Sequence, residues 1–191
     1  PSDRRRPLHA ADLHSAVRVL FRHRVVVVSI LLQTATLGAL FATLSSLQGI
    51  FDRQFGRTES FPLWFALIAV ASMSGSLLNS RIVVTLGMRR VVTATYAGML
   101  ALTLFSLGAI SGGWLPAVIS FGVLVLWCIG LFSMMGLTMG NLNALAMEPV
   151  GHIAGLAASV ISSLATVGSV LLAIPVGLAF NGTSTPLLVG V

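Results

Sequence analysis

Charged residues are scarce in this sequence and are gathered into a few short segments. Asp, Glu, Lys and Arg make up only 8% of the 191 residues, whereas a soluble domain has roughly a quarter. Four runs contain none of them: residues 25–51, 60–80, 91–147 and 152–191. A helix needs about 20 apolar residues to cross a bilayer. The absence of charge therefore excludes a soluble globular domain and predicts an all-α integral membrane bundle.

Residues that carry catalysis or bind metals are also scarce. There is one cysteine, Cys128, and the spacing of His9, His14 and His23 does not place two ligands on one helical face. A serine protease inside the membrane needs a histidine at the depth of its nucleophile, and His152 stands near a membrane edge. The sequence therefore predicts no enzymatic activity, no metal site and no cofactor.

Turn residues divide the apolar runs into spans. SGGWLP at 111–116 interrupts the longest run, and NGTSTP at 181–186 follows the last full one. We expect five membrane-spanning helices, at about 25–50, 61–84, 90–110, 115–140 and 152–179. From residue 186 the sequence reads as a truncated sixth span. Residues 25–191 are thus predicted to form the transmembrane domain, and the chain is expected to be part of a longer protein.

The arginines predict which way the bundle faces. Nine of them stand before the first span or between the second and third, and only Arg53 and Arg57 fall on the other side. By the positive-inside rule, the N-terminus and the 81–90 loop of this multi-pass protein are expected to be cytoplasmic, in the cell (inner) membrane. The basic residues should meet anionic lipid headgroups rather than nucleic acid, which would require exposed aromatics between them.

Residues 1–24 form a separate, polar region that is expected to be a cytoplasmic linker. Within 8–24, Leu13, Val17, Leu20 and Phe21 would share one helical face. This pattern predicts an amphipathic helix lying on the membrane surface. The alternative is a disordered basic linker.

Two lines of small or polar residues run along the spans. In the fifth span small residues repeat at steps of four and three, which is typical of closely packed transmembrane helices; this small-residue stripe is Gly155, Ser159, Ser162, Thr166 and Ser169. In the first span Gln33 lies mid-membrane, where it must face protein or water rather than lipid. Gln33 is therefore either part of a cavity wall or a helix–helix hydrogen-bonding group.

Three of the eleven basic residues lie within GSLLNSRIVVTLGMRR, residues 75–90. This segment resembles the second copy of the cytoplasmic loop motif of the major facilitator superfamily, between helices eight and nine. GLTMGNLNALAMEPVGHIAGLAASV, residues 136–160, is similar to helices ten and eleven of its Bcr/CflA-type drug-resistance branch. The resemblance implies the C-terminal half of a twelve-helix transporter, with helices seven to eleven and the start of twelve. Its partner would be the N-terminal half of the same transporter.

The resemblance also implies roles for the loop residues. Gly75 would allow close helix packing, and Asn79 would contact a helix end of the other half. Gly87 would end the helix before the loop. The loop would be anchored by Arg81, Arg89 and Arg90. The superfamily motif has aspartate at the position of Asn79, so a charge–dipole contact would here be an amide contact.

The implied function is secondary active transport by alternating access, as a proton-coupled efflux antiporter for small lipophilic molecules or drugs. The spans contain no acidic residue at mid-membrane, so a proton carrier would belong to the other half. The substrate cavity is predicted to include adaptable aromatic, methionine and polar side chains; the candidates are Gln33, Thr36, Trp64, Met134 and Met135. Ordinary packing is the alternative for the methionines. The alternative function is a stand-alone half-transporter or scaffold that homodimerises.

Overall fold

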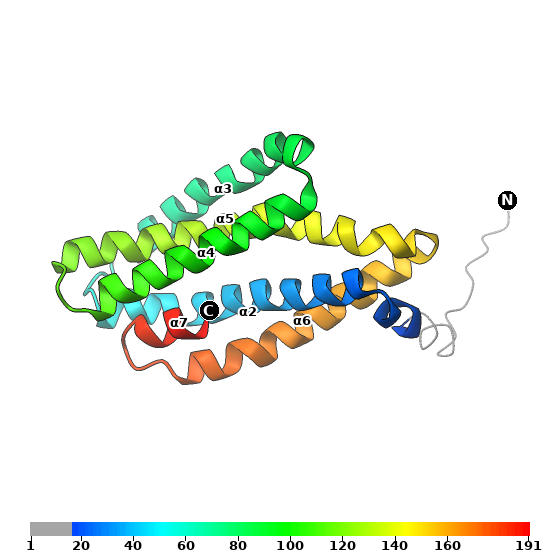
Figure 1. Ribbon diagram of the computed structural model, residues 1–191. Helices are drawn as coiled ribbons and strands as arrows, with labels where there is room; N and C mark the ends of the chain where they lie inside the picture. The colour runs from blue at the N-terminus through cyan, green and yellow to red at the C-terminus, as the bar shows by residue number, and fades with distance from the viewer. Residues whose placement is uncertain (1–16) are drawn as a thin grey trace, which may run out of the picture.

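The computed structural model describes residues 17–191, and its regular structure is entirely helical (Figure 1). A short helical segment covers residues 17–22, before the first long helix. The elements that follow are α2 (Arg24–Arg53), α3 (Phe61–Leu86), α4 (Met88–Ser111), α5 (Ala117–Met147), the 3-10 helix η1 (Glu148–Ile153), α6 (Ala154–Leu178) and α7 (Thr185–Gly190).

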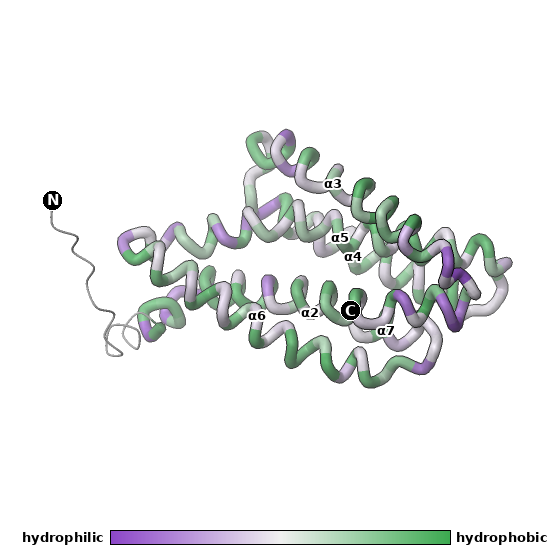
Figure 2. The backbone as a smooth tube through the Cα atoms, turned by 180° about the vertical axis from the view of Figure 1, so that it is seen from behind, coloured by the Kyte–Doolittle hydropathy of each residue, from purple (hydrophilic) through white to green (hydrophobic). Residues whose placement is uncertain are grey.

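Four stretches are long and apolar enough to cross a membrane: α2, α3, α4 and the continuous stretch from Ala117 to Leu178. The last stretch turns back at η1, so that α5 and α6 run in opposite directions (Figure 1). Apolar residues run along the helices (Figure 2), and many of them lie on the outside of the bundle, as Leu63, Val70 and Leu77 do on α3. An apolar exterior of this kind belongs in lipid. The protein is a helical membrane protein.

The five predicted spans fall on α2 to α6, with different end points. The largest difference is at α5, which continues past residue 140 to Met147. Within this additional length, the polar residue Asn141 is buried inside the bundle and its side chain is hydrogen-bonded. Val150, within η1, has non-helical backbone angles and separates α5 from α6. The residues predicted to begin a sixth span form α7.

Glycine and proline set the ends of several helices. A single residue, Gly87, separates α3 from α4, with φ 78° and ψ 150°. This conformation is almost restricted to glycine because a Cβ atom would clash with the backbone. Pro116 precedes α5 in an extended conformation, φ −55° and ψ 145°. These short connections force α3, α4 and α5 to lie side by side.

The helices pack in crossed pairs. α2 packs chiefly on α6, α3 packs on α5, α4 also packs on α5, and α7 lies against α4 and α2. The larger core cluster is centred on Trp127, whose Nε1 donates to Thr103 Oγ1 at 2.9 Å. The smaller cluster joins α2 to α6 through Val26, Ile30 and Ile161.

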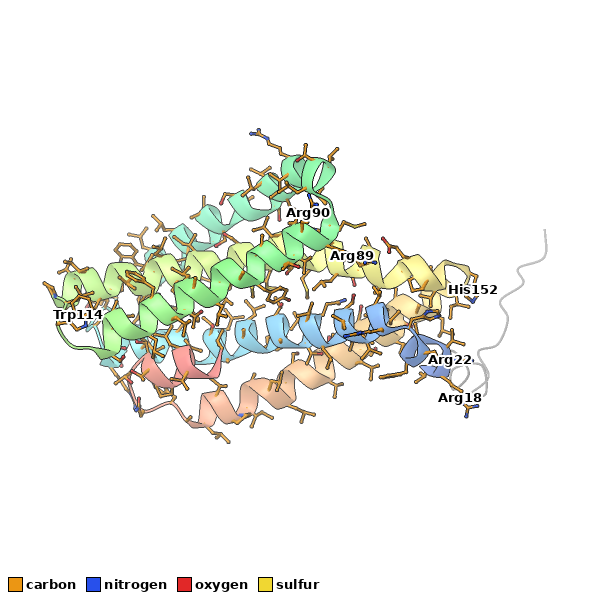
Figure 3. All side chains as sticks on the ribbon, in the orientation of Figure 1. Arg18, Arg22, Arg89, Arg90, Trp114 and His152 are labelled. Atoms are coloured by element: carbon orange, nitrogen blue, oxygen red, sulfur yellow. The ribbon has the colours of Figure 1, made fainter. Side chains whose placement is uncertain are left out.

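The two ends of the bundle carry different residues. Arg89, Arg90, Arg22 and His152 lie toward one end, called here the arginine end, and Trp114 lies at the other (Figure 3). The predicted surface helix at 8–24 lies mostly outside the described residues. Of its predicted apolar face, Leu20 is fully buried in the smaller core cluster and Phe21 is exposed.

Candidate functional site

The crossing of α3 and α5 brings two helix backbones unusually close together. A Cβ atom placed on Gly75 would lie 2.5 Å from the carbonyl O of Ser133. A Cβ atom on Gly136 would lie 2.5 Å from Ser76 Oγ and 2.8 Å from Ser76 N. Both contacts are far shorter than an ordinary van der Waals distance, so each helix presents a glycine where the other helix crosses. Gly75, from the predicted loop motif, thus lies at the closest approach of the two helices.

One turn further along, the two helices are joined by a pair of amides. Asn141 Nδ2 donates to Asn79 Oδ1 at 2.7 Å and to the carbonyl O of Leu137 at 2.7 Å. Asn141 is buried, so its amide is shielded from water and lipid. The resemblance assigns Asn79 to a contact with the other half of a transporter. In this structure its side-chain oxygen accepts a hydrogen bond from Asn141 of the same chain.

The arginines of the loop motif point outward from the arginine end. Arg81 and Arg90 are exposed. Arg89 Nη2 lies 3.9 Å from Glu148 Oε2, and their side chains are 72% and 50% exposed. An ion pair this long and this exposed contributes little stability. These arginines therefore contribute little to the stability of the bundle, and their side chains are accessible to groups outside it.

A partly buried polar cluster links α2 to α4 inside the bundle. Thr36 Oγ1 and Tyr96 Oη lie 2.5 Å apart, and both hydroxyls reach the carbonyl O of Leu32, at 2.9 Å and 3.0 Å. Gln33, on the adjoining face of α2, is buried, and its Nε2 has no hydrogen-bond partner among the described residues. A buried amide without a hydrogen-bond partner is energetically costly.

The predicted cavity residues differ in their burial and surroundings. Gln33, Thr36 and Met134 are buried within the bundle, at 2%, 1% and 4% exposure. Met135 is half-buried, on the same helix as Met134. Trp64 lies in an aromatic cluster near the Trp114 end, edge-on to Phe121 with ring centroids 4.9 Å apart. Thr36 is hydrogen-bonded to Tyr96 of α4, so it serves as a helix–helix hydrogen-bonding group in this structure.

The small-residue stripe of α6 faces away from the bundle. Gly155, Ser159, Ser162 and Thr166 are exposed, and only Ser169 is buried. α6 packs on α2 with a neighbouring face, where Ser169 O is 3.3 Å from a Cβ placed on Gly38, and where Thr34 Cγ2 is 2.7 Å from one placed on Gly168. The stripe is available to a helix other than those described here.

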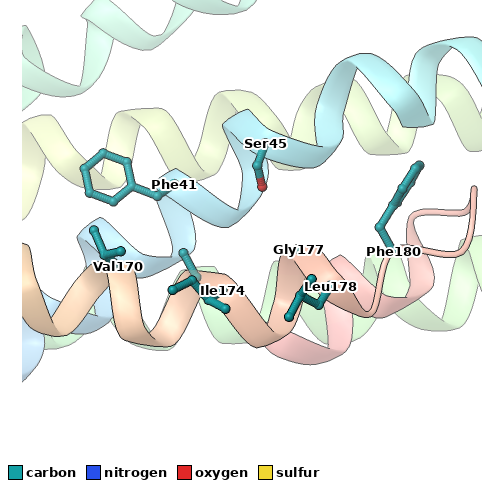
Figure 4. Close-up of a pocket in the computed structure, with 8 residues that line it drawn as sticks. Phe41, Ser45, Val170, Ile174, Gly177, Leu178 and Phe180 are labelled. Atoms are coloured by element: carbon teal, nitrogen blue, oxygen red, sulfur yellow. The ribbon is translucent and has the colours of Figure 1, made fainter.

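An apolar groove follows the seam between α2 and α6 toward the Trp114 end (Figure 4). Its volume is about 530 Å³, within the usual range for sites that hold small molecules. Phe41 and Phe180 lie at its two ends, Ile174 and Leu178 line it from α6, and Ser45 supplies a hydroxyl (Figure 4). The chemistry of this lining suits a lipophilic molecule with few polar groups.

Sequence reasoning missed three residues that organise these sites. Tyr96 is the one tyrosine of the sequence and stands within an uncharged, largely apolar run, which could have marked it as a buried polar contact. Asn141 carries the same kind of signal. Arg57 lies 4.5 Å above the Phe121 ring at the Trp114 end, a cation–π contact that no local pattern indicates.

Comparison with known proteins gives no relative from which to read a role for these sites. No family model matches the chain, and neither the curated proteins nor the solved structures include a match.

Proposed function

We propose that this chain is half of a secondary transporter of the major facilitator type, which exports small lipophilic molecules by alternating access. The observation that carries the proposal is the crossed pairing of two three-helix units, α2–α4 and α5–α7. The first helix of each unit packs on the second helix of the other, as α2 does on α6 and α5 on α3. Inverted repeats related in this way are the building plan of many secondary transporters.

The tight crossings support motion of this half as one body. α3 and α5 cross at Gly75 and Gly136, and α2 and α6 cross at Gly38 and Gly168, where an added Cβ would lie 2.5–3.1 Å from an atom of the other helix. Close-packed contacts of this kind leave little room for helices to slide past one another. Alternating access requires a half that rocks without deforming.

Two outer surfaces of the bundle fit a second set of helices. One is the exposed part of the small-residue stripe on α6. The other is a groove of about 440 Å³ on the α3–α5 face, lined by residues that include Gly75, Ser133 and Arg81. We assign them to the N-terminal half of the same transporter. The stripe also favours a second candidate, a homodimer in which two copies of this chain supply the two halves.

The acidic side chains of the described residues lie at helix ends. Asp52 accepts a hydrogen bond from Thr58 Oγ1 at 2.5 Å, Glu59 is exposed in the same loop, and Glu148 lies beside Arg89. In proton-coupled transport the proton carrier is a carboxylate inside the membrane. The proposal therefore assigns proton coupling to the partner half, and it places the arginine end of this chain on the cytoplasmic side of the inner membrane.

Two measurements test the proposal. An antibody against residues 8–24 should detect a native polypeptide of about twice 20.0 kDa in source membranes. In proteoliposomes, the native protein should export a lipophilic dye, and Ser45→Phe, which narrows the α2–α6 groove, should slow export. Leu44→Phe also places a phenyl ring on α2, at an exposed neighbouring position outside that groove, and should leave export unchanged. Absence of dye export by the native protein, whether a long chain or a dimer, would refute the assignment.

A further inference from the structure

A second groove opens at the arginine end, between the start of α2, the start of α4 and the end of α5. Its volume is about 320 Å³. Arg24 and Arg89 contribute the charged part of its lining, and the walls are mainly apolar, from Val28 and Leu32 on α2, Val92 on α4 and Leu145 on α5. The groove thus combines positive charge at the helix ends with an apolar channel that leads toward mid-membrane.

The positive charge of the groove is only partly compensated by the described residues around it. Arg24 is the first residue of α2 and Arg89 the second of α4, and neither helix has an acidic residue in its first turn. A helix N-terminus already carries a partial positive charge, so both arginines stand where a cation is unfavourable. Arg22 and His23 adjoin Arg24. Against them stands Glu148, 3.9 Å from Arg89 and half exposed.

These surroundings favour an anionic ligand, and the apolar walls indicate that the ligand also has an apolar part. Two guanidinium groups can hold the oxygens of a phosphate through paired hydrogen bonds. A small anion in water would make no use of the apolar side chains of Val28, Leu32 and Val92. A phospholipid satisfies both parts, because its phosphate and its acyl chains are held at the two depths where the groove has charge and apolar surface.

We propose that this groove binds one anionic phospholipid, with its phosphate between Arg24 and Arg89 and an acyl chain along Val28, Leu32 and Val92. Both arginines lie at helix starts, where the apolar spans begin, which is the depth of the headgroups. The site is separate from the α2–α6 groove and from the surfaces assigned to a partner half. It requires only that the bundle spans a membrane, so it does not depend on transport.

The test uses the 191-residue chain in detergent, with retained lipids counted by native mass spectrometry. The probes are palmitoyl-oleoyl phosphatidylglycerol and the zwitterionic phosphatidylcholine with the same chains. We expect one phosphatidylglycerol to be retained in preference to phosphatidylcholine. Arg24→Ala and Arg89→Ala should each weaken retention about fivefold, equivalent to about 1 kcal/mol. Arg90→Ala removes the same charge from the adjoining, exposed position outside the groove lining and should have little effect.

Two further variants separate charge from shape. Glu148→Gln removes the negative charge beside Arg89, at an exposed position, and should strengthen retention. Val28→Trp fills the channel without altering charge and should abolish the preference for phosphatidylglycerol. Leu31→Trp, at an exposed position of α2 outside the groove lining, is its control and should change nothing. Since Glu148→Gln alters only the surface, its effect remains informative even where Val28→Trp impairs folding.

Four results would overturn the inference. Equal retention of the two lipids, or equal effects of Arg90→Ala and Arg24→Ala, would reduce the site to general surface charge. Displacement of phosphatidylglycerol by glycerol phosphate at the same concentration would make it a site for soluble anions. Loss of a dimer in Val28→Trp would show that the groove holds a second copy of the chain. Failure of dye export would leave all of these readings unchanged and would bear only on the transport function.

Discussion

Replacing Gly75 by alanine tests whether the α3–α5 crossing is as tight as its geometry indicates. The added Cβ would lie 2.5 Å from the carbonyl O of Ser133, 2.9 Å from its Cα and 3.0 Å from its carbonyl C. All three are backbone atoms, which cannot swing away as a flexible side chain can. Restoring an ordinary contact requires the two helices to separate by about 1 Å, and overpacking of a well-packed interior costs about 1–3 kcal/mol.

Alanine also has an intrinsic advantage over glycine within a helix, of about 0.5–1 kcal/mol. The net expectation for Gly75→Ala is therefore a destabilisation of up to about 2.5 kcal/mol. Gly98→Ala is the matched control, because Gly98 lies inside α4. Apart from the two adjacent residues and the backbone of its own helix, no heavy atom lies within 4 Å of a Cβ placed there. In the control only the intrinsic advantage acts, so Gly98→Ala should be neutral or stabilising.

The assay is equilibrium unfolding of the purified chain in mixed micelles, with a thermal melt by intrinsic tryptophan fluorescence as a second readout. Gly75→Ala should lower the free energy of unfolding and Gly98→Ala should not. If both variants moved in the same direction by the same amount, the helices would not be in close contact at Gly75. The structural reasoning for the α3–α5 crossing would then be refuted.

The remaining predictions concern the same corner of the bundle. A double-mutant cycle of Asn79→Ala and Asn141→Ala should give a coupling energy of about 0.6 kcal/mol, and at most about 1.7 kcal/mol, which is the range of interhelical hydrogen bonds in membranes. Unfolding in micelles measures this coupling energy. Additive effects of the two substitutions would exclude the hydrogen bond. Gly87→Ala should destabilise the chain by about 1–3 kcal/mol, since its φ of 78° suits glycine almost alone. Gly140→Ala, whose Cβ would meet open space, is the control, and an equal melting temperature for the two variants would contradict the strain.

The helices themselves were accessible from the sequence because their signals are local. Uncharged runs of sufficient length mark the spans, and Gly87 and Pro116 mark where the chain must break. Each of these signals acts through the conformation of a few neighbouring residues. The composition and its punctuation therefore predicted an all-helical membrane bundle without reference to any distant contact.

Contacts between distant residues were not accessible in the same way. The small residues from Gly155 to Ser169 were predicted to form a packing stripe along one helix, but a stripe does not say which helix will cover it, and α6 turns most of that face outward. Thr36 and Tyr96 are joined across 60 positions of the chain by a hydrogen bond that neither local pattern specifies. Their pairing depends on how α2 and α4 are placed by α5, which is a property of the whole bundle.

One misplaced boundary accounts for much of what was missed at the arginine end. With α5 ending near 140, the next residues would form a loop, and their polar groups would be solvated. Because α5 instead continues to Met147, Asn141 faces Asn79 across the α3–α5 crossing and Leu145 forms a wall of the lipid groove. The same extra turns carry Glu148 to Arg89. A backbone inside a membrane must satisfy its hydrogen bonds internally. This requirement favours continuation of the helix past residue 140, whatever the polarity of the side chains there.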